Sequence, residues 1–200
     1  LLHKTVEQGK RIEQLIPDMV NQAVAKLPVP KPMRWGSGRT QFIRPVHTLT
    51  MLYGEKIIAG ETLNVSANNV VTGHRFHHEG LVHIDHADNY EAILRDAYVV
   101  ADYEERKKTI LEQINNAAKE INGIALPDEE LLDEVTSLVE WPVVLVGSFD
   151  EEFLNVPAEP LIYSMKDHQK YFAVTNTEGK LLNKFIFVSN IASKDPSQVI

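Results

Sequence analysis

The sequence predicts an α+β fold, in which helices flank a central mixed or antiparallel sheet. A nearly unbroken apolar run from Trp141 to Phe149, rich in β-branched residues and containing one glycine near its end, predicts a buried strand. Between residues 102 and 121, apolar side chains recur at helical spacing. Such signals follow one another in the order helix, strands, helices, strands, which is typical of segregated α and β segments and not of a doubly wound sheet.

The first half of the chain predicts one helix followed by strands. Helical spacing of apolar residues indicates a helix over residues 4–27, with a kink or break at Pro17 because proline lacks an amide hydrogen. Short apolar runs separated by Gly, Asn and Asp then indicate several strands in succession. These strands are expected at residues 45–52, 56–59, 63–66, 70–76 and 81–84.

The second half predicts three helices that begin at aspartates, followed by a helix and two strands. Asp88, Asp102 and Asp128 are expected to be the N-caps, and Gly123 is expected to end the second of these helices. A short helix is then expected over residues 157–168. The last strands are expected at 170–175 and 184–190, on either side of a hairpin loop at 176–180.

The ends of the chain suggest a piece of a longer polypeptide. The first residue is Leu1, and the last eight residues are mostly polar and include a proline. We therefore expect a helical segment at residues 1–30, one α+β domain at 31–192, and a linker at 193–200 that leads into another domain.

Composition limits the classes of function. The net charge of −8 argues against a protein coated in positive potential, so any nucleic-acid contact must be local. The chain has no cysteine, which excludes a disulfide framework and a thiolate metal site or nucleophile. No apolar run is long enough to span a bilayer and no signal peptide opens the sequence, so we expect no membrane partner and a cytoplasmic location.

A first candidate site lies in residues 31–47, where cationic and aromatic side chains are concentrated around a glycine-containing loop. Arg34, Trp35, Arg39 and Arg44 are the residues suited to an anion such as a nucleic-acid backbone. Alternatively, the aromatic side chains fill a core and the arginines pair with carboxylates.

A second candidate site is the run His74-Arg75-Phe76, which follows a glycine. A histidine, an arginine and a phenylalanine can together hydrogen-bond, neutralise and stack on a nucleotide. Alternatively, Phe76 faces a core and Arg75 pairs with a carboxylate.

A third candidate site lies in residues 164–172, at an expected junction between a helix and a strand. Lys166, His168 and Lys170 could bind a phosphate or the edge of a base there. Asp167 and His168 are adjacent and diverge on a helix, which argues against an acid–base pair. Since no complete catalytic constellation is present anywhere, we expect no catalytic residue.

Six of the eight histidines lie between His47 and His86. Neutral imidazole is a common ligand of transition metals, so this concentration raises the question of a metal site. The spacing does not support one, because His74 and His77 would face opposite sides of a strand and no His-Glu-x-x-His motif is present. We expect no metal site, with these histidines at a polar strand edge or in loops.

Several blocks across the chain form a specific combination. They are Lys31-Pro32-Met33-Arg34-Trp35-Gly36, Phe42-Ile43-Arg44-Pro45-Val46-His47, Gly73-His74-Arg75-Phe76, Glu140-Trp141-Pro142 with Gly147-Ser148-Phe149, Ser164-Met165-Lys166 with His168-Gln169-Lys170-Tyr171-Phe172, and Phe187-Val188-Ser189-Asn190-Ile191. In this order the blocks resemble the β-subunit family of bacterial heterotetrameric glycyl-tRNA synthetase. One departure is Thr48, where the family usually has tryptophan, so one large aromatic side chain is missing at that position.

The resemblance implies an α2β2 enzyme that joins glycine to tRNA(Gly) with ATP. In that family the α subunit holds the adenylate-forming site, with ATP and Mg²⁺, while the β subunit mainly handles tRNA. The resemblance also implies that this piece comes from the N-terminal half of the β subunit and is similar to the editing-type domain of the phenylalanyl-tRNA synthetase β subunit. We expect no cofactor in this piece itself.

From the resemblance we expect a non-catalytic module that positions tRNA or supports the subunit architecture. The candidate contacts with tRNA are Arg34, Trp35, Arg39, Arg44, His74, Arg75, Lys166, His168 and Lys170. One alternative is a domain that hydrolyses mischarged tRNA, with His74 or His168 polarising a water molecule. The other is a purely structural domain that makes subunit contacts.

Overall fold

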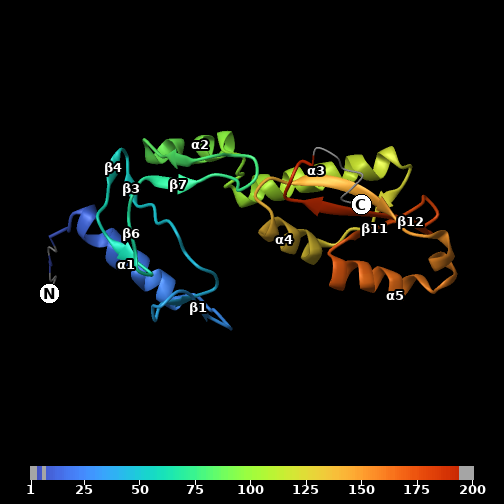
Figure 1. Ribbon diagram of the computed structural model, residues 1–200, viewed down its shortest axis with the longest axis horizontal. Helices are drawn as coiled ribbons and strands as arrows, with labels where there is room; N and C mark the ends of the chain where they lie inside the picture. The colour runs from blue at the N-terminus through green and yellow to red at the C-terminus, as the bar shows by residue number, and fades with distance from the viewer. Residues whose placement is uncertain (1–3, 6–7, 194–200) are drawn as a thin grey trace. The chain divides into compact units, whose positions relative to one another are not determined.

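The computed structural model describes residues 4–5 and 8–193, and its contacts divide the chain into two compact units (Figure 1). The first unit contains the described residues up to Gly73 and then Gly80–Ile93, and the second contains His74–Glu79 and the described residues from Leu94 onward. The chain therefore crosses between the units more than once.

The residue ranges of the two units differ from the domain boundaries that the sequence predicts after residues 30 and 192. Those two boundaries stay predictions. The expected linker, except for its first residue, lies outside the described residues.

The first unit combines one helix with pairs of short antiparallel strands. Its elements are α1 (Ile12–Lys26), β1 (Met33–Arg34), β2 (Gln41–Phe42), β3 (Leu52–Tyr53), β4 (Lys56–Ile57), β5 (Glu61–Thr62), β6 (Val65–Ser66), β7 (Val70–Thr72) and β8 (Leu81–His83). Each strand pairs with its neighbour in sequence, so the unit is a series of hairpins beside a helix. Met51, Ile58 and Ile84 are buried in it.

The helix of this unit is shorter than predicted, because it begins at Ile12 and ends at Lys26. Pro17 lies inside it. The side-chain amide of Asn21 donates to the carbonyl oxygens of Pro17 and Glu61, at 3.0 Å in both cases, and so links α1 to β5.

The prediction of a strand over residues 45–52 is wrong except at Leu52. The carbonyl oxygens of Leu49 and Met51 accept hydrogen bonds from the amides of Asn68 and Ile58 at 2.9 Å, and Thr50 forms an isolated bridge with Asn68. Short runs interrupted by turn residues form local hairpins here, each a two-stranded antiparallel sheet, and these hairpins do not join into one larger sheet among the described residues.

A short 3₁₀ turn, η1 (Ala87–Asn89), leads into α2 (Tyr90–Asp96). The prediction that Asp88 is the N-cap is wrong, because His86 occupies that position. Its Nδ1 accepts a hydrogen bond from the backbone amide of Asp88 at 3.1 Å. An imidazole nitrogen thus accepts the N-cap hydrogen bond that was expected to go to the carboxylate of Asp88.

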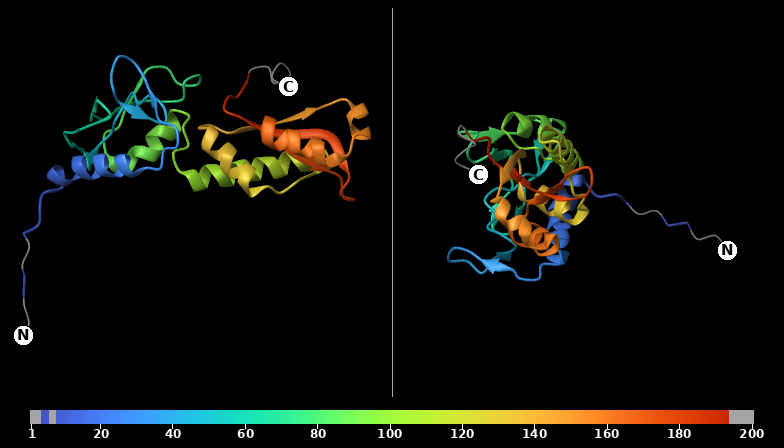
Figure 2. Two further views of the ribbon diagram at one scale, coloured as in Figure 1. Left: turned by 90° about the horizontal axis from the view of Figure 1, so that it is seen from below. Right: turned by 90° about the vertical axis from the view of Figure 1, so that its right-hand side faces the viewer.

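The second unit contains the larger sheet and most of the helices (Figure 2). Its elements beyond α2 are α3 (Tyr103–Glu120), β9 (Ile124–Ala125), α4 (Glu129–Leu138), β10 (Val143–Ser148), η2 (Glu151–Asn155), α5 (Ala158–Tyr163), the π-helical η3 (Ser164–Gln169), β11 (Phe172–Thr175) and β12 (Leu181–Ser189). The sheet is antiparallel in the order β10-β12-β11-β9. The α+β prediction and the antiparallel sheet are confirmed.

Two clusters of buried side chains hold this unit together. Ile110 and Ile114 of α3 and Leu132 of α4 pack with Val174 and Ile186 of the sheet. A second cluster contains Met165, Ala173 and Leu181, with side chains from η2 and α5 around it. Because Ala173 and Val174 are neighbours on one strand, the two clusters lie on opposite faces of the sheet.

Local signals placed the two long helices of this unit correctly. Asp102 accepts a hydrogen bond from the amide of Glu105 at 2.7 Å, and Asp128 accepts one from Leu131 at 2.9 Å, so both predicted N-caps are confirmed. At the end of α3 the left-handed residue is Asn122, with φ 54°, and not Gly123. Gly123 is needed for space, since a Cβ there would overlap Cγ1 of Val174.

Candidate nucleic-acid interface

The β1–β2 hairpin of the first unit carries the cationic side chains of the first candidate site. Its strands pair Met33 with Phe42 and Arg34 with Gln41, and the turn between them includes Gly36 at φ 61°. Arg34, Arg39 and Arg44 are exposed, and Trp35 is half-buried at the start of the turn. We call residues 33–44 the basic hairpin.

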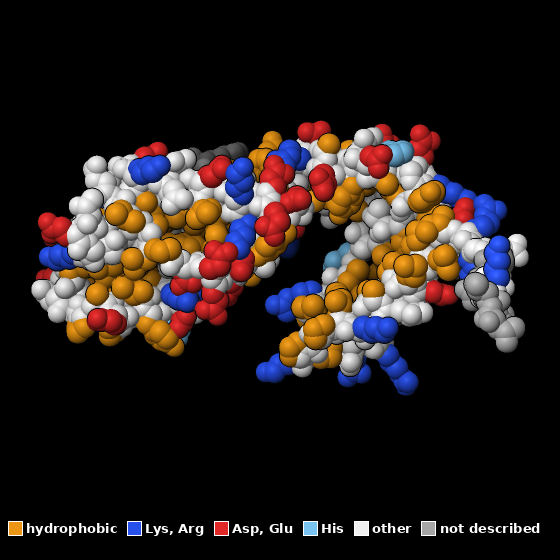
Figure 3. Space-filling model, turned by 180° about the vertical axis from the view of Figure 1, so that it is seen from behind, with side chains coloured by type: hydrophobic (Ala, Val, Ile, Leu, Met, Phe, Trp, Pro, Cys, Tyr) orange, Lys and Arg blue, Asp and Glu red, His pale blue; other side chains and the backbone are white. Residues whose placement is uncertain are grey.

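The arginines of the basic hairpin make no ion pair with a carboxylate in the part of the chain that the structure describes. Arg44 Nη1 donates a hydrogen bond to the sulfur of Met33 at 3.8 Å. Figure 3 shows Lys and Arg side chains gathered at one end of the unit that contains the hairpin. Exposed guanidinium groups without carboxylate partners are free to bind phosphate.

The second candidate site lies in the second unit, and His74 is its anchor. This side chain is 0% exposed. Its Nε2 lies 2.8 Å from the backbone carbonyl oxygen of Asn190, and its Nδ1 accepts a hydrogen bond from the amide of Phe76 at 3.2 Å. These partners require the tautomer that carries its proton on Nε2. Both ring nitrogens of His74 therefore have hydrogen-bond partners within the protein, so neither can polarise a water molecule or contact RNA.

His74 belongs to a group of side chains that we call the histidine–asparagine junction, consisting of His74, His77, Tyr98, Trp141 and Asn190. The His77 ring stacks on His74 at 4.6 Å between centroids, and its Nε2 accepts a hydrogen bond from the amide of Ala192 at 3.1 Å. Tyr98, at φ 60°, lies between His77 and Trp141, with centroid distances of 5.4 and 5.2 Å.

Asn190 completes the junction from the end of β12. Its Oδ1 accepts hydrogen bonds from the amides of Glu140 and Trp141, at 2.7 and 3.0 Å. The blocks around His74, Trp141 and Asn190 thus meet at one place although they are far apart in sequence. The junction fixes the loop so that Arg75 and Phe76 stay outside, with Phe76 66% exposed and the Arg75 guanidinium 5.9 Å from its ring centroid.

The third candidate site is η3, where both lysines have carboxylate partners on or next to α4. Lys166 Nζ lies 2.8 Å from Asp128 and 3.2 Å from Glu130, and Lys170 Nζ lies 2.9 Å from Glu134. The hydrogen bonds to Asp128 and Glu130 raise the pKa of Lys166.

The backbone explains why the two lysines lie beside α4. Lys170 ends η3 in the left-handed conformation, at φ 60°, with its amide bonded to the carbonyl of Lys166 at 3.2 Å. His168 is exposed and packs against the ring of Tyr163, with 5.7 Å between ring centroids.

The predicted contacts therefore form three separate groups. Arg34, Trp35, Arg39 and Arg44 share the basic hairpin, and His74 and Arg75 share the junction loop. Lys166 and His168 lie in η3, and Lys170 directly follows it. Sequence reasoning missed Tyr98, and it included Asn190 in a motif block without giving that residue a role. Asn190 could have been singled out as the polar residue that ends the apolar run of the last strand, but nothing near Tyr98 indicated its ring contacts.

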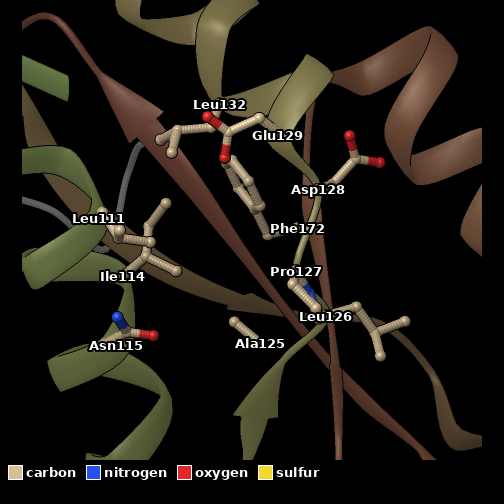
Figure 4. A pocket seen from close by; sticks show the side chains of 10 residues that line it. All are labelled: Leu111, Ile114, Asn115, Ala125, Leu126, Pro127, Asp128, Glu129, Leu132 and Phe172. Carbon is tan, nitrogen blue, oxygen red and sulfur yellow. The ribbon is translucent and has the colours of Figure 1, made fainter. Parts of the chain in front are cut away.

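Two other kinds of site can be assessed from the geometry. Within residues 4–5 and 8–193, no group of three or more His, Asp or Glu side chains is placed to hold a metal ion. A cavity of about 310 Å³ lies between α3 and the start of α4 (Figure 4). Its walls are mainly apolar, including Ile114 and Phe172, and its carboxylates are engaged elsewhere, Asp128 with Lys166 and Glu129 with Lys107.

None of the helices in the described part of the chain is long and apolar enough to cross a bilayer.

Comparison with known proteins gives one consistent result. Residues 1–200 match the model of the family described as "Glycyl-tRNA synthetase beta subunit". The chain is 66% identical over 200 residues to the glycine–tRNA ligase β subunit of Colwellia psychrerythraea, and 58% identical over 200 residues to that of Pseudoalteromonas translucida. It is 57% identical over 201 residues to that of Psychromonas ingrahamii. In each case the match covers 100% of this chain and 29% of the relative.

Proposed function

The chain belongs to the glycyl-tRNA synthetase β-subunit family, and on this basis we propose that it is part of a glycine–tRNA ligase, which joins glycine to tRNA(Gly) with ATP. The chain spans 29% of the length of the curated relatives that it matches, so the activity of the whole enzyme is inferred from them. The proposed partner is an α subunit in an α2β2 assembly, which binds ATP and Mg²⁺. We also propose that the enzyme works in the cytoplasm, where proteins are synthesised.

Within that enzyme we propose that this part of the β subunit is a non-catalytic module that contacts tRNA. The observation that carries this proposal is the basic hairpin, with its exposed arginines and no carboxylate partner among the described residues. A local cationic surface is what a chain with a net charge of −8 needs to meet a phosphate backbone. Trp35 adds an aromatic ring at the start of the turn, where an unpaired base could stack.

The proposed contact set is narrower than the sequence predicted. Arg34, Arg39, Arg44 and Trp35 form its centre, and Arg75 with Phe76 provides a second exposed pair. His74 is left out because it has no accessible atom, and Lys166 and Lys170 are left out because carboxylates already neutralise them.

For the fold we propose a likeness to the editing-type domain of the phenylalanyl-tRNA synthetase β subunit. The antiparallel sheet with helices on both faces supports this proposal. A shared fold does not carry a hydrolytic activity with it, and the buried, doubly bonded ring of His74 argues against that residue as a hydrolytic group.

The test is a salt-dependent titration of the α–β complex with tRNA(Gly), using the variant Arg34→Ala/Arg39→Ala. We expect weaker binding, and a slope of log affinity against log salt that is shallower by about 1 for each lost phosphate contact. The matched control is Lys119→Ala/Lys180→Ala, which removes the same charge from exposed positions without ion pairs in the described structure.

Unchanged affinity and slope in the arginine variant would contradict tRNA contact through the hairpin. That result would leave the architectural role as the function of this part of the β subunit. An equal loss in both variants would show a general effect of net charge and would also contradict the proposed site.

A further inference from the structure

The strand β10 forms one margin of the sheet in the second unit, and it is the unlabelled yellow-orange arrow in Figure 1. It pairs with β12 on one side, in an uninterrupted register from Val143 opposite Ser189 to Ser148 opposite Lys184. No described strand pairs with its other side. This six-residue strand therefore has an open edge.

The side chain of Gln113 shows which backbone groups point away from β12. Its Oε1 accepts a hydrogen bond from the amide of Val144 at 3.0 Å, and its Nε2 donates to the carbonyl of Pro142 at 3.3 Å. Since backbone groups alternate along a strand, the amides and carbonyls of Val146 and Ser148 point the same way. They have no hydrogen-bond partner among the described residues.

The side chain of Gln113 thus makes two of the hydrogen bonds that a neighbouring strand would make, those to the carbonyl of Pro142 and the amide of Val144. It does not reach the rest of this edge. Exposed edges are usually protected by a lysine, a proline or a bulge within the strand, or by a helix or loop that covers them. Val143–Ser148 contains no lysine or proline and its register with β12 has no bulge, while α3 bonds to this edge only through Gln113 among the described residues. An apolar edge of this length without such protection indicates that another strand covers it in the intact protein.

We propose that the edge of β10 from Val144 to Ser148 is paired with a strand from the part of the β-subunit polypeptide that lies outside this chain. The relatives are more than three times as long as this chain, so most of the polypeptide of the family is available for that role. A strand on the same polypeptide also has a high effective concentration at the edge. The proposal rests on family membership and is independent of tRNA binding.

The charges around the edge define the chemistry of that strand. Glu140 precedes β10, and Asp150, Glu151 and Glu152 follow it; all are exposed and without an ion pair in the described structure. Val144, Leu145 and Val146 are apolar and half-buried. A complementary strand is therefore apolar in its middle, with lysine or arginine at its ends.

The same charges argue against a second copy of this chain as the occupant. In a symmetric antiparallel pair centred on Val146, the acidic residue before β10 in one copy would come close to the acidic residues after β10 in the other, Glu140 near Asp150 to Glu152. Like charges brought close together destabilise such a pair, and here the repulsion would occur at both ends of the strand.

The test is hydrogen exchange of the Val146 and Ser148 amides in the full-length β subunit, at low protein concentration and without its partner subunit. We expect exchange slower than in an unpaired strand by about 100-fold or more. Fast exchange overturns the proposal. Protection that appears only after the partner subunit is added, or that grows with protein concentration, also overturns it, in favour of the partner or of a second copy.

Two variants distinguish pairing at the outer edge of β10 from the stability of the strand itself. Val146→Pro removes the outward amide but none of the bonds to β12, which Leu145 and Gly147 make, so Ser148 should exchange faster by about 10-fold or more while Leu145 and Gly147 stay protected. Val146→Thr keeps the amide and should behave as the unchanged protein. If the proline variant does not fold, the exchange measured in the unchanged protein still decides the question.

Discussion

His74 and Asn190 are 116 positions apart in the chain, and the imidazole Nε2 of one lies 2.8 Å from the carbonyl oxygen of the other. The histidine is fully buried. We expect His74→Ala to lower the free energy of unfolding by about 2–4 kcal/mol, because it removes two hydrogen bonds and leaves a cavity. Urea unfolding followed by circular dichroism measures this loss.

The neighbouring residue provides the control. Arg75→Ala changes an exposed side chain with no ion pair in the described structure, so its stability should stay within about 0.5 kcal/mol of the unchanged protein. Equal losses at the two positions would show that the junction is not what holds this loop.

Gly147 provides a test of packing on the sheet. A Cβ there would overlap the ring of Phe185, which in turn stacks on Tyr171 with 4.4 Å between centroids. We expect Gly147→Ala to lower the free energy of unfolding by about 1–3 kcal/mol, because the ring must move and its stack with it. The control is Gly9→Ala, where no atom lies within 4 Å of the added carbon, and thermal unfolding compares the two.

The fold could be predicted from sequence wherever a local signal decides the structure. The caps at Asp102 and Asp128 and the apolar run of β10 each depend on residues within a few positions. Between residues 43 and 84, the runs expected at 56–59, 63–66, 70–76 and 81–84 each contain a shorter strand, which is β4, β6, β7 and β8 in turn. Which backbone groups pair there could not be predicted, because short apolar runs do not specify their partners. Leu49, for example, bonds with Asn68 and not with a neighbouring strand.

The sequence could predict which cationic residues belong to the candidate sites, but not which of them are paired with carboxylates in the fold. The sequence singles out Arg34 and Lys166 alike, since both are cations in motif blocks. Only the fold brings Asp128 and Glu130 to Lys166, across 38 and 36 positions. The same limit applies to His74, whose burial depends on Asn190 at the far end of the chain.

Acid should weaken the contact between α3 and α4 through Asp133. The Lys107 ammonium, with a smaller contribution from the Tyr103 hydroxyl, lowers the pKa of this carboxyl below its usual value of 3.8. A carboxyl whose pKa is lower in the folded state stabilises the fold above the unfolded-state pKa and loses that effect as the pH falls through the folded-state pKa.

Nuclear magnetic resonance titration of the Asp133 carboxyl checks this directly. We expect a midpoint below 3.8 that rises toward that value in Lys107→Met, because the ammonium group is the first cause of the shift. A midpoint unaffected by the loss of Lys107 would contradict the assignment. Asp85, whose pKa is lowered mainly by Asn89, is the internal reference and should not move.

Removing the lysines of η3 should affect stability and not tRNA binding. Lys166 and Lys170 each have a carboxylate within 2.9 Å, and a phosphate would have to displace Asp128 or Glu134 to reach them. We therefore expect Lys166→Met/Lys170→Met to lower the urea midpoint, while the affinity for tRNA(Gly) and its salt dependence stay as in the unchanged α–β complex. A shallower salt slope in this variant, matching the loss in Arg34→Ala/Arg39→Ala, would mean that the lysines exchange their carboxylates for phosphates on binding, and that η3 belongs to the tRNA contact surface together with the basic hairpin.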